Sequence, residues 1–389
     1  MTRAADTGVR ALVSTTFTVV LASLPVFLIG ATAVLIRAEL GFDERALGVL
    51  IAAFYLASGV ISVPGGAIGD AIGARRALLL TTAGTAVALV GVAAFAVSYW
   101  HLLVLMLVAG ASQGTAQPAS NLALSRAVDP DRMGFAFGLK QAAIPAATLI
   151  AGISIPVIAL TLGWRAAFVL PALATLVVPF WLPQGLGTDR AKRPVTGTDS
   201  ARGPLVVLAV AAGCGSAAAI ALPSFLVEAA VARGVGAGVG GVILAVGSVV
   251  GIASRVVAGW RADQREGGHL LVVAGMLALG VVGYGILAVA THPVTFAVGA
   301  ALGYAAGWGW PGLFVYAFVR LNPVATGAGT GIGQAGAMAG AMAGPILFGS
   351  VVAGSSYLVA WSVAAGLGAL AAALVLVGRG WLLRLRRVR

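Results

Sequence analysis

The chain has 389 residues, of which 60% are hydrophobic and only 9% are charged, and its mean hydropathy is +1.03. Because a soluble domain is about a quarter charged, this composition excludes water as the main solvent and indicates an integral membrane protein. The net charge of +12 does not indicate a nucleic-acid partner, since the arginines are dispersed between apolar segments without interleaved aromatic residues.

Long apolar segments follow one another along the whole chain and predict an all-α membrane protein. A span needs about 20 apolar residues to cross a hydrocarbon core of about 30 Å. By that measure the sequence predicts twelve transmembrane helices. They cover residues 11–36, 46–68, 77–97, 101–124, 133–161, 165–182, 204–228, 239–260, 270–290, 294–319, 327–352 and 357–377. The first is too long for the core of a signal peptide, and we expect it to be retained.

The longest polar stretch separates the sixth and seventh spans and predicts how the chain divides. We expect an N-terminal six-helix bundle at 1–182, a flexible cytoplasmic linker at 183–203, a C-terminal six-helix bundle at 204–378 and a basic cytoplasmic tail at 379–389. We also expect a monomer.

Positive charges are unequally divided between the two sides that these spans define. With both termini on the cytoplasmic side, the cytoplasmic segments hold 18 Lys and Arg, whereas the outer loops hold four. The remaining two, Lys140 and Arg255, fall inside spans. The positive-inside rule therefore predicts a multi-pass protein of the cytoplasmic (inner) membrane with both termini in the cytoplasm.

An internal repeat is visible when the second half of the chain is shifted onto the first by 193 residues. The same offset serves three helix pairs. It aligns Gly48, Gly66 and Asp70 with Gly241, Gly259 and Asp263, then Gly110, Gly114 and Pro118 with Gly303, Gly307 and Pro311, and finally Gly134, Gly138 and Gln141 with Gly327, Gly331 and Gln334. Composition bias can produce scattered glycine matches, but it explains the paired Asp, Pro and Gln less easily. The sequence therefore predicts two related halves.

A loop signature follows the second span: Gly66-Ala-Ile-Gly-Asp70-Ala-Ile-Gly73-Ala-Arg75-Arg76. Gly73 permits a tight turn, and Asp70 ends a helix near the cytoplasmic surface. The two arginines can pair with Asp70 or contact anionic lipid headgroups. For either arginine alone, the positive-inside rule is an equally good explanation.

This signature, its weaker echo from Gly259 to Asp263 and the six-plus-six arrangement of spans resemble the major facilitator superfamily (MFS). The resemblance covers essentially the whole chain. It implies two pseudo-symmetric six-helix bundles around a central cavity that opens alternately to each side, with the substrate site near the bilayer midplane. It also implies that the first, second, fourth and fifth spans and their repeats line the cavity. We expect Asp70 to latch a cytoplasmic gate, and the gating candidates are Gly66, Asp70, Gly73, Arg75, Arg76 and Asp263.

Two cationic side chains lie inside predicted spans. Lys140 is about 10 Å into the fifth span at helical rise and precedes Gln141, and Arg255 lies about 8 Å from the cytoplasmic end of the eighth span. A charge there is costly and usually functional, although a long side chain can also lift its charge to a nearby interface. The spacing from Arg255 to Gly259 resembles the eighth-span arginine of monocarboxylate and oxalate-type MFS members, where it contacts the substrate carboxylate.

A polar stripe runs along the fourth span. Gln113, Gln117 and Asn121 recur every four residues and therefore share one helix face. Such a stripe is unfavourable in contact with lipid. Cavity lining explains it, and hydrogen bonding between packed helices explains it nearly as well.

Four further residues complete the candidate substrate site. Gln141 and Gln334 are equivalent in the repeat, which makes them candidates for a site between the two halves. Trp310 occupies the position equivalent to Gln117, and Tyr304 lies six residues earlier. These aromatic residues either shape an amphipathic cavity wall or pack in the core or against lipid.

Acidic residues are absent from the middle of the predicted spans. Glu228, at the outer end of the seventh span, is the nearest to an intramembrane acid. Proton relays and cationic-drug sites usually need a buried carboxylate, so two cationic side chains without a central acid favour an anionic substrate. Glu228 is the proton-coupling candidate, although an interfacial acid is the more frequent case.

We therefore expect a secondary active transporter that moves a small organic anion, monocarboxylate- or cyanate-like, by alternating access with proton symport or exchange. Its partners are then the lipid bilayer, the anionic solute and protons. The alternative within transport is proton-coupled export of amphipathic drugs, which the aromatic and glycine-rich spans favour. Drug exporters often carry an arginine where this chain has Met106, and a Gly-Pro-rich run where it has Gly152-Ile-Ser-Ile-Pro156, so both positions weaken that alternative.

Classes other than transport have less support. No Ser-His-Asp, His-Glu-x-x-His or phosphate-loop pattern occurs in the sequence, and the three histidines are far apart. We therefore expect no enzymatic activity, no cofactor and no metal. A membrane sensor or scaffold would usually carry a soluble signalling domain, whereas the polar segments here are limited to the linker and the tail.

Overall fold

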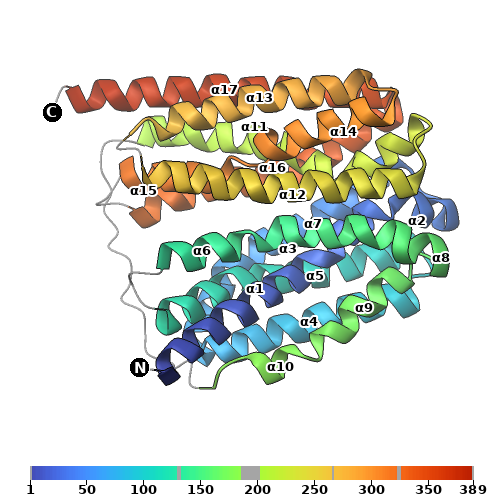
Figure 1. Ribbon diagram of the computed structural model, residues 1–389, viewed down its shortest axis with the longest axis horizontal. Coiled ribbons are helices and arrows are strands. Elements are labelled where there is room, and N and C mark those ends of the chain that lie inside the picture. Colours follow the sequence, from blue (N-terminus) through green and yellow to red (C-terminus); the bar gives the residue numbers. More distant parts are fainter. Residues whose placement is uncertain (1, 129–132, 185–201, 265–266, 322–325, 388–389) are drawn as a thin grey trace. The chain divides into compact units, whose positions relative to one another are not determined.

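The computed structural model describes residues 2–128, 133–184, 202–264, 267–321 and 326–387. The described residues form helices and no strands (Figure 1), which confirms the predicted all-α class. In chain order the elements are α1 (Thr2–Ala31), α2 (Ala33–Leu40), α3 (Glu44–Ile72), α4 (Ala74–Phe95), α5 (Tyr99–Ala127), α6 (Met133–Gln141), α7 (Ala143–Ser154), η2 (Ile155–Ala159), α8 (Leu160–Leu162), α9 (Ala166–Thr175), α10 (Val178–Trp181), α11 (Arg202–Ala232), α12 (Ala237–Asp263), α13 (His269–Val289), α14 (Pro293–Leu302), η3 (Gly303–Gly307), α15 (Pro311–Leu321), α16 (Thr326–Gly354) and α17 (Tyr357–Arg387).

Most of the predicted spans correspond to a single long helical segment. Within the described ranges, ten segments are long and apolar enough to cross a membrane. The predicted sixth span corresponds to a shorter apolar segment, Ala166–Trp181, and the predicted tenth span is divided into α14, η3 and α15. A count of twelve spans therefore stays a prediction at these two places.

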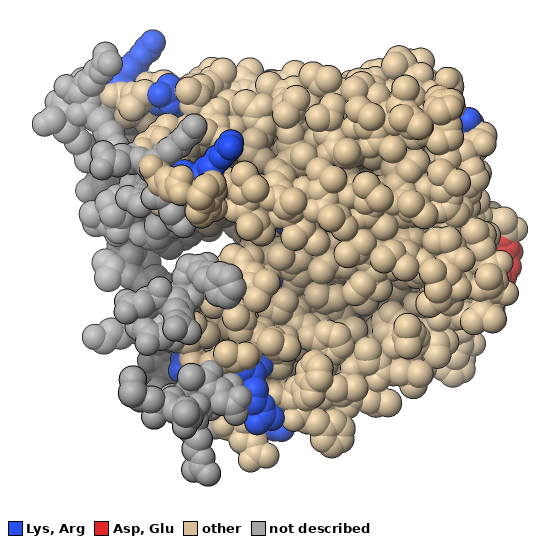
Figure 2. Space-filling view, viewed as in Figure 1, with Lys and Arg blue, Asp and Glu red and all other residues tan. Residues whose placement is uncertain are grey.

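Charged side chains are unevenly distributed along the helices at the protein surface. In Figure 2 the Lys, Arg, Asp and Glu side chains on the visible face lie near the ends of the helices, and the surface between those ends carries almost no charge. Large apolar side chains in the middle of helices are exposed, among them Val87 in α4 (60%), Leu170 in α9 (62%) and Val282 in α13 (51%). A lateral surface of this kind is stable against lipid and not against water, as expected for a multi-pass membrane protein.

The chain forms two compact units. Unit 1 comprises Met1–Asp43, Ala53–Lys192 and Ala237–Ala245, and unit 2 comprises Glu44–Ala52, Arg193–Gly236 and Val246–Arg389. In unit 1, α1 packs against α4, α5 and α7. In unit 2, α11 packs against α16 and α17, and α13 also packs against α17. The predicted linker falls mostly outside the described residues, and the predicted bundle boundaries stay a prediction.

The first turns of α3 and α12 make equivalent helix crossings. In unit 2, a Cβ atom on Gly48 would overlap the backbone carbonyl of Pro345 in α16. In unit 1, a Cβ atom on Gly241 would lie 2.7 Å from the carbonyl oxygen of Gly152 in α7. Gly48 and Gly241 are 193 residues apart, and so are Gly152 and Pro345. The offset found in the sequence therefore relates both members of each contact.

Within unit 2, α11 and α16 approach each other through small residues. Three glycines of α16 recur every four residues and lie on one face of the helix. A Cβ atom on Gly336, Gly340 or Gly344 would overlap the backbone of Ala209, Gly213 or Ala217, respectively. Such close approach replaces the hydrophobic driving force that is missing between helices in lipid.

The variant Gly340→Ala is expected to lower the thermal unfolding midpoint of the purified protein. Its new Cβ atom would overlap the backbone of Gly213, and overpacking of this kind costs about 1–3 kcal/mol. The matched control is Gly285→Ala in α13, where nothing lies within 4 Å of the added atom. Because alanine is the better helix former, the control is expected to be neutral or slightly stabilising. Equal midpoints for the two variants in the same detergent would contradict this interpretation of the crossing.

Candidate functional site

The predicted polar stripe lies along α5 in unit 1, and its three members differ in burial. Gln113 is buried, and its Nε2 donates to the hydroxyl of Ser23 in α1 at 3.1 Å. Its Oε1 is also buried and has no hydrogen-bond partner among the described residues. Gln117 is half-buried and Asn121 is exposed. One end of the stripe therefore serves helix packing, while the other end remains accessible.

Lys140 contacts Asn121, the residue at the accessible end of this stripe. It lies near the end of α6, its side chain is only 2% exposed, and its Nζ donates to Asn121 Oδ1 at 2.6 Å. The amide oxygen of Asn121 carries no net charge, so this contact satisfies one donor without neutralising the ammonium. The neighbouring Gln141 is exposed. The structure thus joins two predicted candidates, Lys140 and Asn121, that are 19 residues apart.

In unit 2, the predicted tenth span is broken by Pro311, the first residue of α15. Proline has no amide N–H, so the carbonyl of Gly307, four residues earlier, loses its regular helical donor. The indole Nε1 of Trp310 donates to this carbonyl at 3.0 Å. Trp310 is 1% exposed. This candidate for a cavity wall therefore lies in the interior, where its indole completes the backbone hydrogen bonding of a helix break. Just before the break, η3 is a turn of π-helix, a feature often found at functional sites.

Two neighbours on α12 contact the same break. The hydroxyl of Ser254 donates to the carbonyl of Ala305, and Arg255 Nη2 donates to the carbonyl of Trp308 at 2.8 Å. The guanidinium carbon of Arg255 is 5.1 Å from the ring centroid of Trp308, within the range of a cation–π interaction. The ring of Tyr304, which is fully buried, packs edge-on against Trp308 at 5.4 Å. The predicted candidates Arg255 and Tyr304 therefore belong to one cluster.

A small cavity of about 30 Å³ lies beside Trp310 and brings in another predicted residue. Gln334 of α16, which is exposed, contributes to its lining together with Pro311 and Phe314. A space of this size holds about one water molecule and not an organic solute. The Trp310–Gln334 pair is thus adjacent, while its role in substrate binding stays a prediction.

Glu228 is buried, although an exposed interfacial position was the more frequent expectation for such an acid. Its side chain is 3% exposed, and the hydroxyl of Tyr357, at the start of α17, donates to Glu228 Oε2 at 3.2 Å. Tyr357 is 129 residues away, and nothing in the sequence pattern pointed to it. Unit 2 therefore contains a buried carboxyl group with a phenolic hydrogen-bond donor.

The predicted gate loop has the expected backbone turn. Gly73 alone joins α3 to α4 and has a φ of 85°, a conformation that favours glycine. Asp70 lies in the last turn of α3 with its side chain exposed. Gly66, one turn earlier, faces Pro118 of α5, whose side chain would lie 3.9 Å from an added Cβ.

The structure pairs neither arginine of the gate signature with Asp70, one of the two kinds of partner expected for them. Arg75 Nη2 donates to the backbone carbonyl of Pro179 at 3.4 Å, and Arg76 is exposed. Among the described side chains, no ion pair joins either arginine to Asp70. The side chain of Asp263 lies outside the described residues. The gating role of all six candidates stays a prediction.

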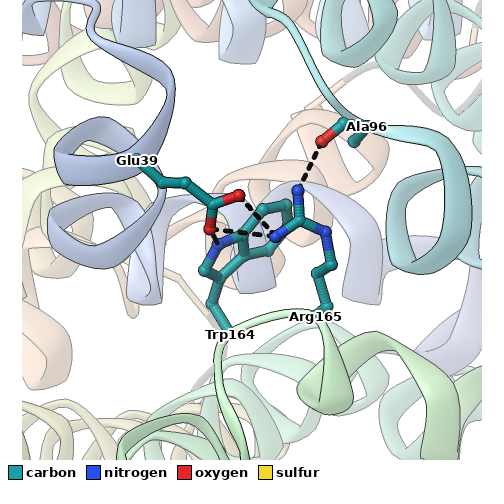
Figure 3. A network of polar contacts seen from close by, with 4 residues as sticks. All are labelled: Glu39, Ala96, Trp164 and Arg165. Atoms are coloured by element: carbon teal, nitrogen blue, oxygen red, sulfur yellow. Dashed lines mark hydrogen bonds and ion pairs between the residues drawn. The ribbon is translucent and has the colours of Figure 1, made fainter.

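A polar network that the sequence did not reveal lies in unit 1 (Figure 3). Glu39 Oε2 accepts a hydrogen bond from Trp164 Nε1 at 2.7 Å, and Arg165 Nη1 forms an ion pair with Glu39 Oε1 at 2.7 Å. Arg165 Nη2 also donates to the carbonyl of Ala96 at 2.9 Å. The donated hydrogen bond of Trp164 and then that of Arg165 lower the pKa of Glu39 below its ordinary value of 4.5.

This network predicts a pH-dependent contribution to stability. Because the pKa of Glu39 is lower in the folded state, its stabilisation is present above pH 4.5 and is lost as the pH falls below that value. The thermal midpoint of Glu39→Gln is therefore expected to lie below that of the unmodified protein at pH 7, with the difference shrinking towards pH 3. The gap is expected to be modest, since both side chains are partly exposed. A gap that stays constant over this range would contradict the assignment.

Comparisons with known proteins agree with this architecture. The sequence model of the family described as Major Facilitator Superfamily matches residues 15–294. The crystal structure of a D-xylose-proton symporter superposes with a TM-score of 0.74 at 14% identity and covers 94% of this chain and 96% of that one. A bacterial homolog of the human lysosomal transporter Spinster, in an inward-facing and unoccupied conformation, gives a TM-score of 0.71 at 13% identity with 96% of each chain covered. At these identities the likeness shows the fold alone.

A curated relative shares a shorter segment. The probable sulfoacetate transporter SauU of Cupriavidus necator is 30% identical over 150 residues, which is 38% of this chain and 34% of that protein. The match thus spans about a third of the relative's length.

Among the residues that the structure describes, no group of three or more His, Cys, Asp and Glu is placed to hold a metal ion.

Proposed function

Because this chain belongs to the Major Facilitator Superfamily, we propose that it is a secondary active transporter that moves a small organic anion across the cytoplasmic membrane by alternating access. One observation carries this proposal: each unit has a cationic side chain within a predicted span and in contact with an uncharged acceptor. Lys140 contacts the amide oxygen of Asn121, and Arg255 contacts the backbone carbonyl of Trp308. Charges at such depth usually serve a substrate or ion.

The proposed substrate carries a carboxylate or a sulfonate. A guanidinium donates two parallel hydrogen bonds to the oxygens of such a group, and an ammonium contacts them as a compact charge. Arg255 uses Nη2 for the Trp308 carbonyl, and a guanidinium has five N–H donors in all. The curated relative is named a probable sulfoacetate transporter, and sulfoacetate contains both groups. Sulfoacetate is therefore the first compound to test, followed by acetate, oxalate and cyanate.

We propose Glu228 as the proton-binding group. Its carboxyl group is buried in a span and accepts a hydrogen bond from the Tyr357 hydroxyl, and acids buried in spans often belong to proton pathways. Gain and loss of a proton at Glu228 would then accompany each transport cycle.

Drug export has less support than anion transport. The aromatic residues that favoured an amphipathic cavity wall are Tyr304, Trp308 and Trp310, and their side chains are 0%, 6% and 1% exposed. All three belong to the helix break of unit 2, where they contact one another, Arg255 or backbone carbonyls. Their burial leaves little aromatic surface for an amphipathic drug.

The decisive experiment measures uptake of labelled anions into proteoliposomes with and without a pH gradient. Accumulation of sulfoacetate or another small anion that depends on the gradient is the expected result. Glu228→Gln is expected to keep exchange of internal for external anion but to lose accumulation driven by the gradient. Flux of a cationic amphiphile with no flux of any anion in the panel would refute the proposal.

A further inference from the structure

A second cavity lies wholly within unit 1, outside the candidate substrate site. It has a volume of about 640 Å³, in the range of small-molecule sites. Its walls come from the start of α1, the start of α4, and α10 with the residues that follow it, and α10 packs against both of the other helices (Figure 1). The lining residues are Arg10, Arg75, Pro179, Phe180, Leu182, Pro183 and Gln184.

Two arginines give this cavity a positive wall. Arg75 is half-buried and Arg10 is exposed, and no acidic residue is among the described lining residues. Arg75 Nη2 donates to the Pro179 carbonyl, whereas its Nε is buried and has no hydrogen-bond partner among the described residues. A buried donor without an acceptor is unfavourable. A small rotation of the guanidinium towards the cavity would give Nε an anionic oxygen as a partner.

The cavity lining also has an apolar part, which includes the exposed side chain of Phe180. Phe180 lines the cavity and is 80% exposed. Its neighbours Trp181 and Leu176 are 47% and 63% exposed. In a membrane protein, exposed apolar side chains beside a tryptophan are typical of the boundary between headgroups and acyl chains. The cavity therefore joins two arginines to an apolar surface, which matches the two parts of an amphiphile.

We propose that this cavity binds the phosphodiester headgroup of an anionic membrane lipid. Arg75 and Arg10 hold the phosphate oxygens, and Phe180 contacts the first part of an acyl chain that runs along α9 and α10. Inorganic phosphate would satisfy the arginines but would leave the apolar wall without a partner. The proposal does not depend on the transported substrate.

Native mass spectrometry of the full-length purified protein tests this assignment. Phosphatidylglycerol and phosphatidylcholine with identical acyl chains are titrated separately, and apparent affinities are compared. The protein is expected to prefer phosphatidylglycerol. Arg75→Gln is expected to weaken its binding about fivefold, the factor that corresponds to about 1 kcal/mol for one cation at a membrane surface.

The matched control is Arg76→Gln. Arg76 is the adjacent residue and carries the same charge, but it is exposed and does not line the cavity, so a smaller loss than that of Arg75→Gln is expected. Arg10→Gln is the second variant if Arg75→Gln does not fold, and Phe180→Ser should weaken lipid binding without removing charge. Equal losses in Arg75→Gln and Arg76→Gln would overturn the assignment. Competition by inorganic phosphate at concentrations comparable to those of the lipid would overturn it as well, in favour of a soluble phosphate.

Discussion

Replacing Arg255 by glutamine is expected to lower kcat/KM for anion uptake about 100-fold. Loss of one partner from a buried hydrogen-bonded charge pair typically costs about 2–5 kcal/mol, and tenfold in affinity corresponds to about 1.4 kcal/mol. Glutamine is two atoms shorter than arginine, so the variant removes both the charge and the hydrogen bond from Nη2 to the Trp308 carbonyl. Proteoliposome uptake of the best anion in the panel is the measurement.

A structural role for Arg255 gives a different result. If its main task is to satisfy the carbonyl of Trp308, the variant will unfold at lower temperature but transport normally per folded molecule. Arg255→Lys helps to separate the two roles, because lysine keeps the charge but loses the forked geometry. Partial uptake by the lysine variant, with a raised KM, supports substrate contact. Arg261→Gln, at an exposed position on the same helix, is the control for loss of a positive charge.

Lys140→Gln is expected to reduce uptake by about 10- to 100-fold without lowering thermal stability. The ammonium is almost completely buried against the amide of Asn121, and a buried charge is unfavourable for folding, so removal of the charge should leave stability unchanged or raise it. A loss of function with no loss of stability is typical of a residue retained for its ligand. The converse variant, Asn121→Ala, removes one acceptor of the ammonium and should destabilise the protein.

Uptake and thermal midpoint must be measured on the same preparations of these variants. Arg45→Gln, which removes an exposed cation elsewhere in the chain, is expected to leave both quantities near those of the unmodified protein. If Lys140→Gln takes up every anion at the normal rate, Lys140 has no part in substrate binding. Its burial would then reflect packing alone.

The features that follow local rules could be predicted from the sequence. Hydropathy predicted the helices, and the signature around Asp70 predicted the superfamily that the comparison with known families confirms. Gly73 adopts the positive φ that its position between two helices requires. The offset of 193 residues related Gly48 to Gly241, and the structure places both at equivalent crossings. Helix formation and backbone turns depend on residues that are close together in the chain, so the order of residues is enough to predict them.

Features that depend on distant partners could not be predicted. Glu39 and Arg165 are 126 residues apart and no pattern in the sequence relates them, although they form an ion pair. Burial of Glu228 depends on Tyr357 at the start of another helix. The hydrogen bond from the Trp310 indole to the Gly307 carbonyl could not be predicted either, because a hydropathy profile does not show which carbonyl a proline leaves without a donor. Such pairings become visible only when the helices are placed in three dimensions.

The break in the tenth predicted span has a consequence for biogenesis. The helical segment before the break, α14 with η3, has 15 residues (10 and 5), and α15 after it has 11, so both are shorter than the roughly 20 residues that cross the hydrocarbon core. Neither segment would partition into the bilayer by itself during translocation. Ser254 and Arg255 reach the carbonyls at the break from α12, which is synthesised earlier. Insertion of this region should therefore wait for α12, and truncated chains that lack that helix should leave residues 293–321 outside the membrane.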